Sequence, residues 1–154
     1  MKKLLKFLAI LFAVCVFTCA ISCNQTQESQ PSSSNSGLAK SLVKVVDNKV
    51  VILVDDDYMQ IKDTTVLVDY MHALKADGAL EFTMADGMVN SINGKENPAD
   101  YSSCWMLYSN DGELTNQAWG SVKVDGVEYF SAVLGAERLP IKNGKTYVWE
   151  YKTF

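Results

Sequence analysis

Apolar and polar residues fall into blocks along the chain, and the first block lies at its start. Residues 7–21 are apolar except for Thr18, and three lysines precede them. A basic start followed by a short apolar stretch that ends in small residues is typical of a secretory signal peptide. A membrane-spanning helix needs roughly 20 apolar residues. We therefore interpret residues 1–22 as an export signal and not as a permanent transmembrane helix.

The apolar block ends in a four-residue motif with a cysteine. The motif Ala20-Ile21-Ser22-Cys23 resembles the bacterial lipoprotein box, although Ala20 stands where leucine is usual. In that family the cysteine receives a diacylglycerol and becomes the first residue of the mature protein. The resemblance implies that Cys23 is the lipid attachment site and that the protein is exported and anchored to the cell membrane, facing outward. Cleavage by ordinary signal peptidase after Ala20 is the alternative.

A purely polar segment follows the cysteine. Residues 24–37 read NQTQESQPSSSNSG and contain neither an aromatic nor an aliphatic side chain. Such a segment cannot bury enough apolar surface to fold. We expect residues 23–37 to form the anchor and a disordered tether, which as a flexible coil would reach about 20 Å. Residues 38–154 then form one globular domain.

Within this domain, the pattern first predicts two strands and then a helix. Residues 42–46 and the β-branched run at 50–54 form a hairpin, and the acidic run 55–57 ends it. Four apolar residues then follow helical spacing and form one stripe, namely Leu67, Tyr70, Met71 and Leu74. Thr64 or Thr65 can cap the start of this helix, and Gly78 can end it. His72 falls off the stripe, on the solvent side.

The remainder of the domain has the pattern of short strands. Strands at 80–84 and 88–92 flank the turn Asp86-Gly87, and strands at 122–124 and 127–130 flank Asp125-Gly126. Residues 105–108 are apolar on both faces and predict a central strand. In the final strand, at 146–152, aromatic residues alternate and predict one buried and one half-solvated face. One helix packed on a mostly antiparallel sheet is an α+β architecture.

Charge and cysteine content argue against a nucleic-acid-binding protein and against a domain held together by disulfides. Without residues 1–22, the chain carries 11 basic and 18 acidic side chains, a net charge of −7, and Arg138 is its only arginine. Nucleic acid is therefore not an expected partner, because phosphate binding needs clustered basic residues. Of four cysteines, only Cys104 lies beyond the predicted anchor, so no intrachain disulfide is expected. Its apolar neighbours predict that Cys104 is buried.

Several motifs of the domain resemble the transcobalamin-like carboxy-terminal domain family. The helix at 65–74, the hairpin GMVNSING at 87–94, the strand CWMLY at 104–108 and the segment from Asn143-Gly144 to Tyr151 occur in that family's order. The resemblance implies a small β-grasp-like domain with one helix across a sheet. In the animal cobalamin carriers this module covers one face of cobalamin, and a separate helical barrel holds the other. The stretch 109–112 and an insertion at 113–137 depart from the pattern.

The ionisable residues do not predict a catalytic centre. His72 is the one histidine and is expected to be solvated. In the run 55–57 the side chains of Asp55 and Asp57 could converge on a hard cation, but the spacing lacks the EF-hand pattern. We therefore expect a solvated turn, no metal, no cofactor and no enzymatic activity.

The aromatic residues give the candidate binding site. Trp105 and Trp149 are expected to pack in the core, whereas Trp119 stands in a polar, loop-like context and is a candidate ligand contact. Together with Asn93 and Tyr108 it makes up the expected ligand-binding set. The leading hypothesis is a surface binding module for a small ligand, for which the resemblance suggests a corrinoid. The alternative is a structural or interaction module that contacts another envelope protein.

Overall fold

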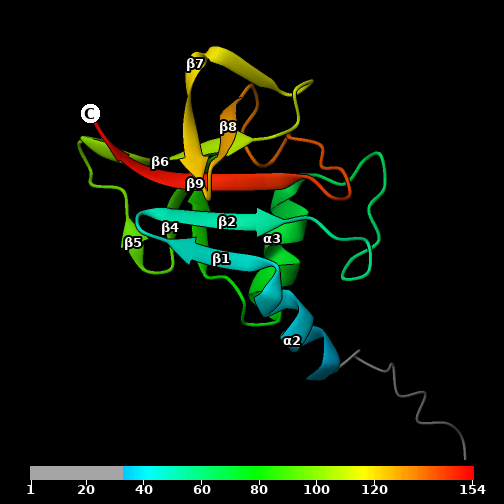
Figure 1. Cartoon of the computed structure of the whole chain (residues 1–154). Helices are drawn as coiled ribbons and strands as arrows, with labels where there is room; N and C mark the ends of the chain where they lie inside the picture. The colour runs from blue at the N-terminus through cyan, green and yellow to red at the C-terminus, as the bar shows by residue number, and fades with distance from the viewer. Residues whose placement is uncertain (1–32) are drawn as a thin grey trace, which may run out of the picture. The chain divides into compact units, whose positions relative to one another are not determined.

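Two antiparallel sheets and two helices make up the part of the chain that the structure describes, residues 33–154 of a computed structural model (Figure 1). The larger sheet has the order β1-β2-β9-β6-β8-β7, with β1 Val43–Val46, β2 Lys49–Leu53, β9 Thr146–Thr153, β6 Ser103–Ser109, β8 Val127–Ala132 and β7 Thr115–Val124. The smaller sheet has the order β3-β4-β5, with β3 Phe82–Ala85, β4 Met88–Ile92 and β5 Lys95–Glu96. The predicted α+β class is confirmed.

Helix α3, Leu67–Ala76, is the predicted helix, and its apolar stripe lies in the main core. All four stripe residues are fully buried, and His72 is exposed. The predicted cap is wrong: Val66 occupies the N-cap, and its backbone N–H donates to the Asp69 carboxylate. The Thr65 hydroxyl instead accepts a hydrogen bond from the backbone N–H of Lys62, within the preceding turn. Gly78, with a φ of +70°, ends the helix as predicted.

Helix α2, Ser33–Ser41, was not predicted, and it includes the last residues of the expected tether. It is tied to the domain because the Ser36 hydroxyl donates to the backbone oxygen of Asp77, at 3.1 Å. Ala39 and, just after the helix, Leu42 lie in the main core. The composition of residues 24–37 predicts no helix, because the burial that holds α2 comes from Ala39 and Leu42, just beyond that segment. The predicted signal peptide, Cys23 and residues 24–32 lie outside the described residues.

Three hairpins form where the sequence predicts them. The β3–β4 and β7–β8 turns have positive φ at both central residues, Asp86-Gly87 and Asp125-Gly126. This conformation matches the twist of the flanking strands and suits the Asp-Gly pair. The β1–β2 hairpin pairs Val46 with Lys49. Strand β3 begins two residues later than predicted: its pairing with β4 starts at Phe82, and the backbone N–H of Glu81 donates to the side-chain oxygen of Asn93 instead.

The larger sheet is buried on both faces near its centre. Trp105, Leu107 and Trp149 face α3, whereas a second cluster of buried side chains covers the opposite face. This second core consists of Tyr108, Val122, Val124, Tyr129 and Val148. The expectation that the face of β9 with Val148 is half-solvated is therefore wrong at that position, because the β7–β8 hairpin bends over it (Figure 1). A salt bridge of 2.6 Å between Lys44 and Asp125 joins the hairpin tip to β1, at the other edge of the sheet.

Candidate ligand pocket

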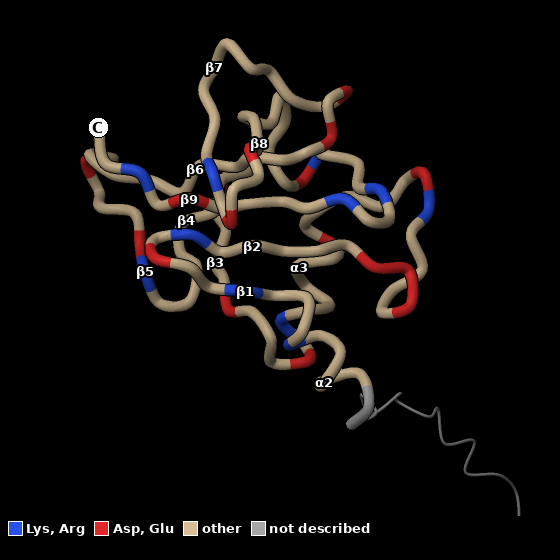
Figure 2. Tube along the Cα trace, in the orientation of Figure 1, with Lys and Arg blue, Asp and Glu red and all other residues tan. Residues whose placement is uncertain are grey.

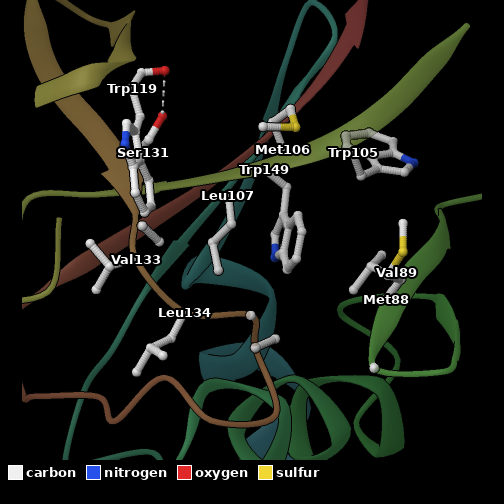
Figure 3. A pocket seen from close by; sticks show the side chains of 14 residues that line it. Met88, Val89, Trp105, Met106, Leu107, Trp119, Ser131, Val133, Leu134 and Trp149 are labelled. Carbon is white, nitrogen blue, oxygen red and sulfur yellow. Dashed lines mark hydrogen bonds between the residues drawn. The ribbon is translucent and has the colours of Figure 1, made fainter. Parts of the chain in front are cut away.

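A cavity of about 480 Å³ opens between the β3–β4 hairpin and one face of the larger sheet (Figure 3). Its walls come from the β3–β4 turn and β4, from β6, β7 and β9, and from the end of β8 with the segment that follows it. The lining residues are Gly87, Met88, Val89, Trp105, Met106, Leu107, Trp119, Ser131, Ala132, Val133, Leu134, Gly135, Ala136 and Trp149. A volume of this size lies within the usual range for small-molecule sites, about 300–1,000 Å³.

The register of the central strands places the floor of the cavity. Leu107 on β6 pairs with Trp149 on β9, and Trp105 lies two residues before Leu107. Because side chains alternate between the two faces of a strand, Trp105 and Leu107 share one face. The smaller sheet is held close to this floor by β5: Trp105 Nε1 donates to the backbone oxygen of Lys95 at 2.8 Å, and the Tyr151 hydroxyl donates to that of Glu96 at 2.8 Å.

Three large apolar side chains stand exposed at the cavity. Met88 is 46% exposed, Trp119 is 62% exposed and Val133 is 37% exposed. Trp119 lies within β7 and not in the predicted loop. Its exposure has a local cause: the pairing of β7 with β8 is interrupted between Asn116 and Ser121, and Gly120 has a φ of +113°. The strand therefore bulges, and the indole is displayed instead of packed.

The lining of the cavity is uncharged. None of its fourteen residues is ionisable, and charged residues are also missing from the upper part of β7 that carries Trp119 (Figure 2). The Ser131 hydroxyl donates to the backbone oxygen of Trp119, at 3.3 Å. Among the described residues, the buried Nε1 of Trp149 has no hydrogen-bond partner. A charged ligand would thus lose its hydration with no opposite charge to replace it.

The structure does not bring the three predicted ligand contacts together. Trp119 lines the cavity, but Tyr108 lies on the other face of β6, fully buried in the second core. Burial and, next, the Glu150 carboxylate raise the pKa of Tyr108 to about 12. Asn93 lies in a turn outside the lining, and its side-chain oxygen accepts a hydrogen bond from the backbone N–H of Glu81, at 3.0 Å.

Sequence reasoning missed most of the residues that form the cavity. The sequence pattern does not distinguish Met88 or Val133 from other apolar residues, and it predicts only core packing for Trp149. Val133 lies in the insertion 113–137, which departs from the transcobalamin-like pattern, so that departure was the available signal. Nothing in the local sequence distinguishes Met88 from an ordinary strand residue. Its position beside Asp86-Gly87, at the tip of a hairpin, is what exposes it.

In the acidic run 55–57, side-chain carboxylates accept hydrogen bonds from backbone N–H groups of the same turn. Asp55 Oδ1 accepts a hydrogen bond from the backbone N–H of Asp57 at 2.8 Å, and Asp56 Oδ1 accepts one from that of Ile61 at 3.3 Å. Across residues 33–154, no three His, Cys, Asp or Glu side chains are grouped so that they could hold a metal ion. The hydrogen bonds account for the run as a structured turn.

Cys104 is partly exposed, which contradicts the predicted burial. It lies near the start of β6, and its sulfur lies 3.6 Å from that of Met106, on the face opposite Trp105. The burial that it does have raises the pKa of its thiol, which disfavours the nucleophilic thiolate.

Comparisons with protein families, with curated proteins and with solved structures find no match to this chain. The transcobalamin-like resemblance therefore rests on the short sequence motifs alone. Neither helix within residues 33–154 is long and apolar enough to cross a membrane.

Proposed function

We propose that this chain is an exported, membrane-anchored lipoprotein whose domain binds a small, mainly apolar ligand without reacting with it. The observation that carries the binding role is the uncharged cavity of about 480 Å³ with Met88, Trp119 and Val133 exposed around it. Exposed apolar side chains gathered at a concave surface are typical of a binding site. The lining offers neither an ionisable acid or base nor a thiol, which supports binding without catalysis.

A ligand smaller than a corrinoid fits these observations best. A corrinoid carries many peripheral amide groups, and these need hydrogen-bond partners, whereas the side chains that line the cavity offer only indole N–H groups and the Ser131 hydroxyl. Tyr108, one of the contacts expected for a corrinoid, faces the second core. The resemblance to the transcobalamin-like family still makes cobalamin the reference compound for a competition experiment.

The membrane anchor is the second part of the proposal. It is supported by Ala20-Ile21-Ser22-Cys23 and by the polar residues that directly follow it. A lipid on Cys23 would hold the domain close to the membrane surface, where small apolar molecules accumulate. The anchor and the apolar cavity are thus compatible with one role at the cell envelope.

Fluorescence of the neutral dye N-phenyl-1-naphthylamine, which rises when the dye leaves water, tests the binding role. The chain should raise the dye's emission, and Val133→Asp should weaken dye binding at least about tenfold, because it places a charge in an apolar wall. Val127→Asp is the matched control, since Val127 is also exposed, at 48%, and lies outside the lining. Equal weakening by both variants, or no emission change with the unmodified chain, would refute the proposed pocket.

The alternative, a docking module for another envelope protein, is favoured by one observation. Strand β7 lies at the edge of the larger sheet, next to β8 only, and it carries the exposed Trp119. An open edge can add a strand from a partner. A photo-crosslinking residue at position 119 distinguishes the two roles in intact cells. A discrete protein adduct, together with no dye binding, would support the docking module.

A further inference from the structure

We infer that the indole Nε1 of Trp149 is the hydrogen-bond donor that orients the ligand, so that the ligand is a neutral, apolar molecule with an acceptor oxygen, such as a ketone or ester carbonyl. This inference rests on the proposed function, because it assigns the ligand class for the same cavity. It adds a positioning contact and a chemical requirement that an apolar pocket alone does not impose.

Trp149 carries the inference because its polar atom is buried and unpaired. The residue is 4% exposed and lines the cavity, and its Nε1 has no hydrogen-bond partner among residues 33–154. Nearly all buried donors in proteins are paired, so an unpaired one needs an explanation. Figure 3 shows the nitrogen edge of the Trp149 ring turned toward the side of the cavity where Leu107 lies. A ligand acceptor in the cavity would supply the missing partner.

Trp105, the neighbouring indole on the cavity floor, differs from Trp149 because its Nε1 is already paired. Trp105 also lines the cavity and is also buried, but its Nε1 donates to the backbone oxygen of Lys95 at 2.8 Å. In Figure 3 the Trp105 nitrogen lies on the edge of the ring that is turned away from Trp149. One buried indole donor is thus used to join β5 to β6, and the other is left for the cavity.

The remaining lining limits the ligand further. The absence of ionisable residues from the wall favours a neutral molecule. The Ser131 hydroxyl proton is already donated to the backbone oxygen of Trp119. The buried part of the lining therefore favours a ligand that has one hydrogen-bond acceptor facing Trp149 and is apolar elsewhere.

The Nε1 atom is shielded from solvent in the structure, so the proposed contact requires the wall of the cavity to move aside. The segment 133–136 forms one wall of the cavity and lies beyond the end of β8. Its Val133 is exposed, and Leu134 packs only partly buried against the main core. Backbone hydrogen bonds hold the two ends of the segment, from Val133 N–H to the oxygen of Leu114 and from Val68 N–H to the oxygen of Ala136. Between these ends it is not paired in a sheet, unlike β6 and β9, so the middle of the segment is the part of the wall that adapts most easily.

A ligand pair and a variant pair test the donor. The probes are 1-tetralone and tetralin, which have nearly the same shape and differ in one carbonyl. Both are titrated by ligand-observed NMR against the full-length chain carrying Cys23→Ala, which removes only the predicted attachment residue. Trp149→Phe keeps the aromatic bulk and removes the donor. We expect the ratio of the tetralone to the tetralin dissociation constant to rise about 3- to 10-fold in Trp149→Phe, as for the loss of one hydrogen bond.

Tyr151→Phe is the control, because Tyr151 lies outside the lining and the variant removes a side-chain donor that the protein already uses, the hydroxyl that donates to the backbone oxygen of Glu96 at 2.8 Å. It should leave the ratio unchanged, whatever it does to thermal stability. If both probes bind the unmodified chain and Trp149→Phe does not change the ratio, the inference is wrong while the apolar pocket stands. If neither probe binds the unmodified chain at its solubility limit, the proposed function fails and the inference with it.

Discussion

Truncation of Leu74 gives a quantitative test of how helix α3 packs. Leu74 is fully buried in the main core together with Leu67, Tyr70 and Met71. Leu74→Ala removes three carbons, which at about 0.8 kcal/mol each gives about 2.4 kcal/mol of lost transfer free energy. The cavity left behind adds a further cost, so we expect a loss of about 3–4 kcal/mol in the free energy of unfolding. That is a large part of the 5–15 kcal/mol typical of a domain.

Urea unfolding followed by far-UV circular dichroism measures this loss. The midpoint should fall with little change in the slope, because the same surface is exposed on unfolding. His72→Ala is the control on the same helix: His72 is exposed, and its replacement should cost under about 0.5 kcal/mol. The packing of α3 would be refuted if Leu74→Ala cost under about 1 kcal/mol, or if His72→Ala cost as much as Leu74→Ala.

Three further predictions concern the anchor, the rim of the cavity and alkaline pH. Cys23→Ala should move the protein from the membrane to the soluble fraction on cell fractionation, and an intact mass without acyl groups in the unmodified protein would contradict the anchor. Trp119→Ala should weaken binding of N-phenyl-1-naphthylamine about fivefold with little change in melting temperature, since the indole is 62% exposed; unchanged dye affinity would exclude Trp119 as a contact. Burial raises the pKa of Tyr70 and of Tyr147 to about 12, so the folded state holds their protons more tightly than the unfolded state. Stability should therefore be retained below about pH 10 and fall as the pH rises toward 12, and a melting temperature that stays constant over that window would refute the assignment.

Local patterns predicted the helix and the hairpins because their causes are local. The stripe of α3 follows from the 3.6-residue period, and the turns at Asp86-Gly87 and Asp125-Gly126 follow from the φ values that glycine and aspartate tolerate. Helix α2 and the burial of Val148 depend instead on contacts between distant segments. Ser36 bonds to Asp77, and Val148 is covered by the β7–β8 hairpin. No window of neighbouring residues contains that information.

In the candidate site, too, some features follow from the local sequence and others depend on contacts between distant segments. The polar context of Trp119 correctly predicted exposure, although the residue lies on a bulged strand. The position of Tyr108 in a motif predicts a ligand contact, but the alternation of side chains along β6 puts this residue in the second core. The free donor of Trp149 was not predictable, since it depends on where each indole nitrogen points after β5, β6 and β9 have come together.

The position of β9 sets the order in which this domain can form. Strand β9 lies between β2 and β6, and it pairs residues 146–150 with residues 49–53, which precede them by nearly a hundred positions. Closing such long loops makes folding slow compared with local helix formation. The larger sheet stays divided until residues 146–153 have been synthesised, with β1–β2 separated from β6–β8–β7. A partly synthesised chain therefore cannot complete the larger sheet, and such a delay is an advantage for any protein that must cross a membrane before it folds.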